Sequence, residues 1–321
     1  MCLPEQLLAA IKGVYTGFDV RIAQVTHEYK GSGIKLDGNF CYLTFRDAAP
    51  TVDEFAEYTY HRIIPYCLPR KTRAEKDKKY ASTGDTRYIH ELTDQARNLF
   101  IKARQTQGKS GEPGEVILFM FLEAILGAPQ IACKMYLKTS EKMPVHGSDS
   151  VHLGVGKSGP QLLLFWGESK LYCAVSSALD EIAKSISTFI SSKSGRAPRE
   201  RDLDIIVDHM DIEDAGLKTA LTRYFDPYEK DSLNLQEVYA CFVGFDYCFR
   251  NTEKCLTNEE IEEQFKKAYS DRVSAICELF AEKMKKSGLH QLKFHVFLLP
   301  FPSIADFRKQ FFGHLGCADA S

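Results

Sequence analysis

Three charged residues in the middle of the chain have the types and spacing of a metal-dependent hydrolytic site. Asp149 precedes an alternating run of apolar residues, and Glu168 and Lys170 close the next apolar run, two residues apart. Carboxylate oxygens are the ligands that Mg²⁺ prefers, and this ion commonly binds through one or two carboxylates together with substrate phosphates. A lysine beside the ion can orient a water or help to deprotonate it. The three residues therefore predict phosphodiester hydrolysis with Mg²⁺ or Mn²⁺, because such an ion polarises a phosphoryl oxygen.

The elements that must position these residues have the pattern of a β-hairpin. An alternating apolar run precedes a turn at residues 156–160 that contains two glycines and a proline, and a longer apolar run follows the turn. Antiparallel pairing across this turn brings Asp149 opposite Gly167 or Glu168, with Cβ atoms roughly 5 Å apart. Glu168 and Lys170 then share one face of their strand. The pattern predicts that all three side chains are neighbours.

The same residues also fit a structural alternative. A solvent-facing strand end can carry an Asp, a Lys and a Glu as a salt-bridge cluster, which contributes little to stability. Short motifs of this kind often match by chance. The spacing alone leaves both interpretations open.

Two resemblances favour the hydrolytic interpretation. An Asp, a turn and Glu-x-Lys on the next strand resemble the PD-(D/E)xK nuclease superfamily, with Ser148 standing where that pattern often has proline. The chain also resembles the HamA family of Hachiman anti-phage defence, well over about residues 110–250 and poorly over the N-terminal third. The segments that carry this resemblance are 114–119, 126–130, 134–135, 137–140, 145–149 and 166–172.

The HamA resemblance implies a nuclease effector that works with HamB, a superfamily 2 helicase, to destroy DNA during infection. It implies Asp149 and Glu168 as metal ligands, Lys170 as the catalytic lysine and Glu115 as a further catalytic acid. Glu115 equally suits a structural role, because the helix dipole favours a carboxylate in the first helical turn. Glu123, two turns along the same helix, is the alternative acid.

Other candidate motifs are interpreted as structural. His146 and His152 flank Asp149 and are expected to be hydrogen-bonded histidines of the fold. The ten cysteines have no Cys-x-x-Cys pair and are expected to be reduced. Residues 156–158 imitate the end of a P-loop, but Val151 stands where that motif needs its first glycine, so nucleotide binding is not expected.

The net charge of −2 conceals a strong asymmetry. Residues 61–110 contain twelve Lys or Arg against five acids, whereas residues 201–260 contain six against fourteen. Two basic clusters are candidates for phosphate contact, with a solvated charged loop as the alternative for the first. Their members are Arg70, Lys71 and Arg73 in the first cluster and Lys193, Arg196 and Arg199 in the second.

The expected elements give an α/β fold. From residue 115 onward their order, αβββαβ, is that of a restriction-endonuclease-like core, preceded by an N-terminal α+β domain over residues 1–108 and followed by helix-strand-helix additions within residues 109–321. The glycine-rich stretch at 105–114 is the expected boundary, and residues 1–108 are a candidate docking surface for the partner. Helices are expected at about 52–65, 86–105, 115–127, 174–192, 258–286 and 303–315, and strands at 18–26, 39–46, 131–138, 203–207 and 292–298.

Composition agrees with a globular protein, because 44% of the 321 residues are hydrophobic and 26% are charged. No apolar stretch reaches the roughly 20 residues of a membrane helix, so a cytoplasmic protein without membrane partners is expected. The sequence thus predicts a Mg²⁺-dependent DNA nuclease of a Hachiman-type complex. Two alternatives are a non-enzymatic adaptor that binds DNA or a helicase, and a nuclease directed at RNA.

Overall fold

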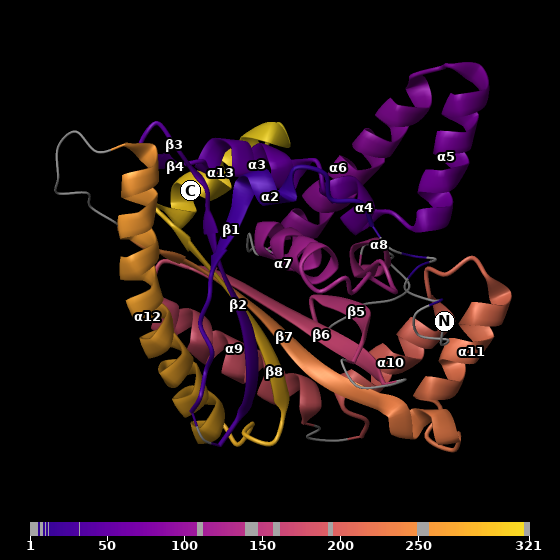
Figure 1. Ribbon diagram of the computed structural model, residues 1–321. Coiled ribbons are helices and arrows are strands. Elements are labelled where there is room, and N and C mark those ends of the chain that lie inside the picture. The colour runs from indigo at the N-terminus through magenta and orange to yellow at the C-terminus, as the bar shows by residue number, and fades with distance from the viewer. Residues whose placement is uncertain are drawn as a thin grey trace. The chain divides into compact units, whose positions relative to one another are not determined.

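The chain folds into two compact units. Unit 1 consists of Met1–Val14, His61–Gly167 and Thr188–Val238, and unit 2 of Tyr15–Tyr60, Glu168–Ser187 and Tyr239–Ser321. Both units combine segments from before and after residue 108; the domain boundary expected there stays a prediction. The computed structural model (Figure 1) describes residues 6, 9, 11, 13–31, 33–107, 112–138, 147–156, 161–191, 195–248 and 257–317.

Six strands form a mixed sheet in the order β1-β2-β8-β7-β6-β5. In unit 2, β2 pairs with β1 antiparallel and with β8 parallel, and β8 also pairs parallel with β7. In unit 1, β5 pairs antiparallel with the first part of β6. The strands are β1 Ile22–Val25, β2 Lys35–Leu43, β5 Ser150–Val155, β6 Leu162–Tyr172, β7 Leu235–Asp246 and β8 Lys293–Phe301.

The parallel strands β7 and β8 form the core of unit 2. Residues 238–245 and 296–301 are buried without interruption, and both segments are apolar runs. Such continuous runs are typical of strands that are covered on both faces, whereas a strand with one solvated face alternates. The helices of unit 2 are α2 Phe18–Arg21, α3 Val52–Tyr60, the main part of α9 Val175–Ile190, α12 Asn258–Lys286 and α13 Ile304–His314, beside the short strands β3 Phe45–Arg46 and β4 Ala49–Pro50.

Helix α12 shows how local sequence defines an element of unit 2. The Thr257 hydroxyl accepts from the Glu260 amide, and the Glu260 carboxylate accepts from the Thr257 amide, which is a complete capping box. Lysines occupy the last turn, where they interact favourably with the helix dipole, and Gly288 follows in the left-handed conformation at φ 72°. The predicted range of this helix is therefore confirmed.

Unit 1 consists mainly of helices, together with strand β5 and the first part of β6. Helix α7 Glu112–Ala124 is its most buried element, because residues 116–122 are each at most 1% exposed. Helices α5 and α6 pack on each other as a hairpin (Figure 1), and α5 buries none of its own residues. The helices are α4 Ile63–Cys67, α5 Arg70–Thr83, α6 Arg87–Gln107, α7, α8 Lys134–Lys138, α10 Pro198–Asp208, α11 Ala215–Phe225 and the 3₁₀ turn Lys230–Asn234.

Two expected strands are helices. Residues 131–138 were predicted as a strand, but helix α8 occupies most of that segment, because a short buried apolar run does not distinguish the two states. Residues 203–207 lie within α10, whose first turn contains Pro198 and Glu200, and both residue types favour a helix start. The predicted αβββαβ order is therefore wrong in those two strands, and the observed order from residue 112 is α7-α8-β5-β6-α9-α10.

Smaller differences occur near the N-terminus. The strand expected at 18–26 begins as α2, and the helix expected at 52–65 divides into α3 and α4. The first basic cluster lies on a helix, α5, so the charged loop considered for it is wrong. No helix in the described part of the chain has the length and apolar character needed to cross a membrane.

Candidate functional site

The position of Asp149 follows from the pairing of β5 with β6. The register places Ser150 opposite Gly167, and the Asp149 amide donates to the Gly167 carbonyl over 2.8 Å. A side chain at Gly167 would clash here, since a Cβ would lie 2.2 Å from the Ser150 hydroxyl oxygen. Asp149 is half-buried, and Glu168 follows Gly167 directly in the chain. The expected hairpin is confirmed.

Glu168 and Lys170 lie in unit 2, on the last part of β6, and form an ion pair. The Lys170 Nζ atom is 2.5 Å from Glu168 Oε1, and the two side chains are 20% and 11% exposed. Both charges act on the thiol of Cys241 in β7. Burial raises the pKa of Cys241, the Glu168 charge raises it further, and the Lys170 charge opposes this. The low exposure of Glu168 and Lys170 shows that this ion pair is mostly buried, unlike the solvent-facing strand end considered as the alternative.

Glu115 belongs to a buried acidic cluster in unit 1. Its Oε2 atom accepts a hydrogen bond of 2.5 Å from the Tyr66 hydroxyl, and the two residues are 6% and 1% exposed. Burial raises the pKa of Tyr66 well above its ordinary value, and the charges of Glu115 and Asp149 add to this effect. The structure thus places Glu115, Tyr66 and Asp149 in one electrostatic cluster.

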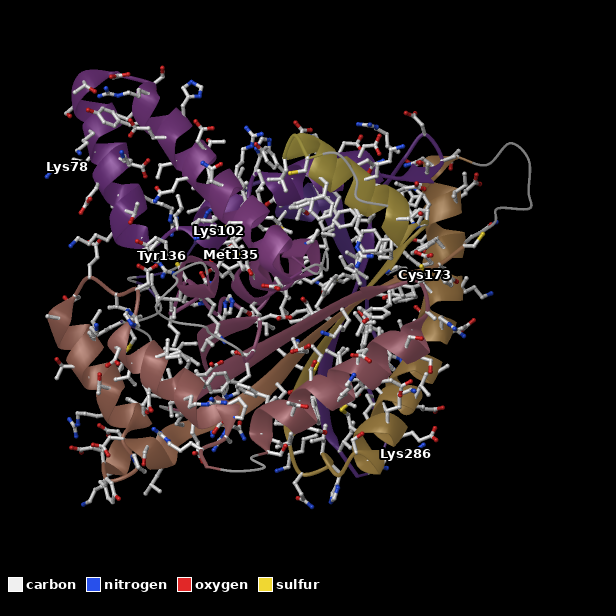
Figure 2. The ribbon with its side chains drawn as sticks, turned by 180° about the vertical axis from the view of Figure 1, so that it is seen from behind. Lys78, Lys102, Met135, Tyr136, Cys173 and Lys286 are labelled. Carbon is white, nitrogen blue, oxygen red and sulfur yellow. The ribbon has the colours of Figure 1, made fainter. Side chains whose placement is uncertain are left out.

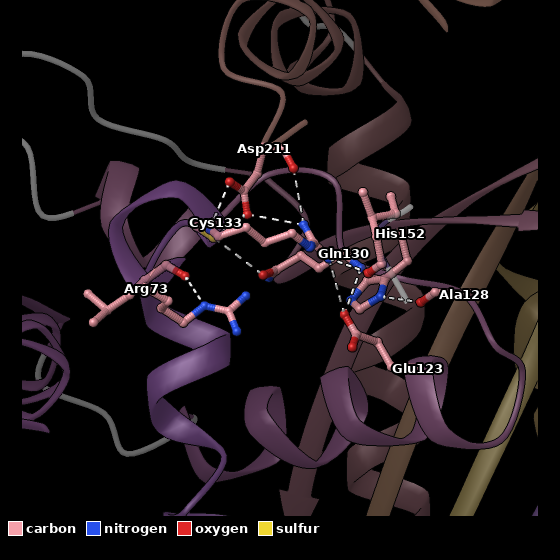
Figure 3. Close-up of polar contacts among 10 residues, drawn as sticks. Arg73, Glu123, Ala128, Gln130, Cys133, His152 and Asp211 are labelled. Carbon is pink, nitrogen blue, oxygen red and sulfur yellow. Dashed lines mark hydrogen bonds and ion pairs between the residues drawn. The ribbon is translucent and has the colours of Figure 1, made fainter. Parts of the chain in front are cut away.

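The alternative acid, Glu123, has a different environment (Figure 3). Its Oε1 atom accepts from the Gln130 amide at 2.9 Å and lies 3.8 Å from the Arg70 guanidinium. Arg70 in turn donates to Asp211 over 3.0 Å. Glu123 therefore fixes the loop after α7, whereas Glu115 belongs to the acidic cluster.

His152 has the structural role expected for it. It is fully buried, and its Nδ1 atom donates to the Ala128 carbonyl at 2.8 Å. Burial lowers the pKa of His152 to about 3, with a further lowering by the Arg70 charge and an opposing effect of the Ala128 hydrogen bond. The ring is therefore neutral near pH 7. His146 lies outside the described residues.

The arginines of the two basic clusters interact with protein groups. Lys71 is exposed on α5, and Lys193 lies outside the described residues. The observed partners are Asp211 for Arg70, the Leu68 carbonyl for Arg73, Asp204 for Arg196 and Glu237 for Arg199. Phosphate contact by these arginines stays a prediction, and it would require them to exchange or share those partners.

Sequence reasoning missed three residues near Asp149. Tyr66 is the partner of Glu115, and Lys134 and Asp202 form a buried ion pair next to Ser148. Only Lys134 had a signal in the sequence, because it lies in a segment that resembles HamA. Tyr66 and Asp202 are distant along the chain from the residues that they contact.

The side-chain chemistry of Asp149 and of Glu168, each considered by itself, suits Mg²⁺. Both are carboxylates, and Mg²⁺ usually keeps several waters and takes only one or two carboxylates from the protein. Among the described residues, no group of three or more His, Cys, Asp and Glu side chains is gathered as a metal centre. The assignment of Asp149 and Glu168 as ligands remains a proposal.

The fold and these clusters define a mixed α/β protein whose β-hairpin carries an acid at its base and whose sheet carries a buried Glu-Lys pair. The model of the HamA family matches residues 18–315, so the chain belongs to the HamA family of Hachiman anti-phage defence. The resemblance to HamA noted in the sequence is confirmed, and the match extends into the N-terminal third. No curated protein matches the chain.

Proposed function

We propose that this chain is the metal-dependent DNA nuclease effector of a Hachiman complex and that it acts with a HamB-like superfamily 2 helicase. The observation that carries the proposal is the hairpin. The pairing of Ser150 with Gly167 brings Asp149 to the strand that continues into Glu168 and Lys170. This order of residues resembles the PD-(D/E)xK pattern, and the resemblance supports the proposal because the chain belongs to a defence family.

Each residue has a chemical role in this proposal. Asp149 and Glu168 hold the Mg²⁺ or Mn²⁺ ion, which when bound polarises the scissile phosphate and makes hydroxide available at neutral pH. Lys170 orients the attacking water and takes part in moving its proton. Its ion pair with Glu168 supports this role, because the pair already holds the ammonium beside one proposed ligand.

Glu115 acts as the supporting acid. It lies in the same electrostatic cluster as Asp149, and Tyr66 holds its carboxylate in one orientation. A restriction-endonuclease-like core is part of the same proposal. The antiparallel hairpin, the helix α7 before it and the helix α9 after it support that core, although two of its expected strands are helical.

Two other functions compete with this one. An adaptor of the same fold, which binds DNA or a helicase without chemistry, does not require a lysine beside paired carboxylates. A nuclease directed at RNA would use the same residues, so substrate tests have to separate it from a DNase. DNA is preferred because the family resemblance implies it.

The test is cleavage of linear DNA and RNA by the purified chain, with and without its helicase, in Mg²⁺ and ATP. We expect Glu168→Ala and Asp149→Ala to abolish DNA cleavage while the circular dichroism spectrum stays parental. Lys170→Arg retains the charge but does not release a proton readily, so it should be nearly as inactive as Lys170→Ala if proton transfer matters. EDTA should stop cleavage, and Ca²⁺ should support little turnover because its geometry is less exacting.

The matched control is Glu181→Gln, which changes an exposed acid of α9 whose contact with Lys184 is a surface pair at 3.5 Å. This variant should cleave as the parent does. Cleavage that survives Glu168→Ala, or full activity in EDTA, would contradict the metal site. Cleavage of RNA in place of DNA would favour the RNA-directed alternative.

A further inference from the structure

A fully buried ion pair lies directly beside the segment that leads to Asp149. Lys134 of α8 and Asp202 of α10 are each 2% exposed, and the Lys134 ammonium contacts Asp202 Oδ2. Isolated charges are expensive to bury, and a buried pair is often no more stabilising than apolar residues of the same size. The ion pair alone is therefore weak evidence of a stabilising role, and its contacts indicate what it holds in place.

Both members of the pair bind the main chain of Ser148. The Lys134 Nζ atom donates to the Ser148 carbonyl at 2.5 Å and to the Ser148 hydroxyl at 3.0 Å. The Ser148 amide donates to Asp202 Oδ2 at 3.3 Å. The carbonyl and the amide of the residue before Asp149 are thus fixed by opposite charges. Proline, which the nuclease pattern often has at this position, would lack both the amide hydrogen and the hydroxyl.

Gly147 makes the approach of Asp202 possible. A Cβ at Gly147 would lie 2.2 Å from Asp202 Oδ2 and 2.6 Å from its Cγ atom, and real Cβ atoms do not come that close. The Asp202 carboxylate therefore packs against the main chain of residue 147 as well as binding that of Ser148. Any side chain at 147 would move the carboxylate or the main chain.

The other side of Asp149 is fixed by the sheet. Its amide donates to the Gly167 carbonyl, and Ser150 is already in register with Gly167. The main chain around Asp149 is thus restrained by the ion pair before it and by β6 after it. Groups that orient a ligand in this way are characteristic of metal sites, where outer partners tune affinity.

We propose that Lys134 and Asp202 are positioning residues that hold the main chain of Gly147 and Ser148 so that the Asp149 carboxylate is directed toward the metal. This inference rests on the proposed nuclease function. The proposal predicts two separable effects of disturbing the Lys134–Asp202 pair. Without metal, the main chain around Asp149 should become less ordered. With metal, the chain should bind the ion more weakly.

The experiment uses the full-length chain with Mn²⁺ as the probe. Three variants disturb the pair: Gly147→Ala, Asp202→Asn, and the double variant Lys134→Met with Asp202→Leu, which replaces both charges by apolar side chains of similar size. We expect Mn²⁺ affinity, measured by calorimetry, to fall by about 10- to 100-fold in each, as for other outer partners of metal ligands. Hydrogen exchange of the amides at 148–150, measured without metal, should become faster in the same variants.

Two control variants separate positioning from general stability. Gly313→Ala adds a Cβ that meets nothing within 4 Å, and Glu229→Gln removes one partner of an exposed ion pair with Arg223. Both should keep parental affinity and parental exchange at 148–150. The double variant leaves the buried carbonyl, hydroxyl and amide of Ser148 without these partners, so its unfolding temperature should fall together with its affinity. Gly147→Ala removes no charge and gives the answer if Asp202→Asn does not fold.

The outcomes distinguish the two proposals. A parent that does not bind Mn²⁺, and does not cleave DNA even together with its helicase and ATP, would contradict the proposed function. A parent that binds Mn²⁺, with Gly147→Ala and the double variant binding equally well, would contradict the positioning role alone. Unchanged exchange at 148–150 in those two variants would also overturn it, because the ion pair would then not order the main chain there.

Discussion

Buried carboxylates in unit 1 differ in their hydrogen-bond donors, and the donors indicate their roles. Glu123 accepts from a main-chain amide and lies near Arg70, so it organises a loop. Asp202 is neutralised by Lys134. Glu115 accepts from the Tyr66 hydroxyl, a neutral group whose own pKa is raised by burial and by the charges around it. Glu115 and Asp149 both act on the Tyr66 hydroxyl, which links Glu115, of these three acids, to Asp149.

His152 gives a prediction about stability and pH. Its pKa is about 3 in the folded chain against an ordinary value of 6.5. As the pH falls below 6.5, the unfolded chain binds a proton at this residue and the folded chain does not, so the free energy of unfolding decreases until the pH reaches about 3. The contribution can reach about 1.4 kcal/mol per pH unit within this window.

Urea unfolding between pH 7 and pH 5 checks this prediction. We expect the free energy of unfolding of His152→Gln to fall less steeply than that of the parent as the pH is lowered. The control His290→Gln changes an exposed histidine and should keep the parental slope. A parental slope in His152→Gln would show that this ring is not the buried neutral group described here.

The candidate residues found from the sequence are those that lie near one another along the chain. Asp149, Glu168 and Lys170 fall on a single hairpin, and the period of two residues on a strand specifies which side chains share a face. Tyr66 and Asp202 lie 49 and 68 residues from Glu115 and Lys134, their respective partners. Their placement depends on helix packing, which no local pattern in the sequence describes.

At the scale of elements, the sequence predicts best those helices whose first and last residues are marked by capping residues or by a glycine. Helix α12 has a capping box and a glycine after its last turn, and its observed range equals the predicted one. The strands predicted at 131–138 and 203–207 are helical, because short apolar runs fit either state when they are buried. In the second segment the competing signal, Pro198 at the helix start, was present in the sequence.

Helix α5 gives a prediction about DNA binding. Arg70 and Arg73 direct their guanidinium groups to protein acceptors, whereas Lys71 and Lys78 are exposed, and Figure 2 shows Lys78 projecting from the outside of the helix. If α5 contacts phosphates, Lys71→Ala and Lys78→Ala should each weaken DNA affinity for all sequences. The slope of log affinity against log salt should fall by about 1 for each contact removed.

Binding measured at several salt concentrations decides this, with Lys184→Ala on α9 as an exposed control. Arg70→Ala should instead lower the unfolding temperature, because it leaves the half-buried Asp211 and the buried Glu123 without their cation. Parental affinity in the Lys71→Ala Lys78→Ala double variant would remove α5 from the proposed DNA surface.

At the scale of the whole molecule, charge argues against tight DNA binding by this chain alone. The net charge is −2, and positive charge is concentrated in residues 61–110 while residues 201–260 are strongly acidic. Non-specific affinity for DNA grows with the number of phosphates that Lys and Arg neutralise, and the arginines described in both basic clusters already have protein partners. A partner that supplies DNA contacts would compensate for this deficit.

We therefore expect the chain to copurify with a HamB-like helicase, and the complex to degrade linear DNA only when ATP is hydrolysed. The isolated chain should cleave little at physiological salt, because few phosphate contacts survive screening there. A complex that contains Glu168→Ala is the matched control, since it should still hydrolyse ATP and bind DNA but should not degrade it. Equally rapid cleavage by the isolated chain would contradict control by the helicase. Degradation that continues with a non-hydrolysable ATP analogue would show that the partner recruits the nuclease to DNA but does not drive it.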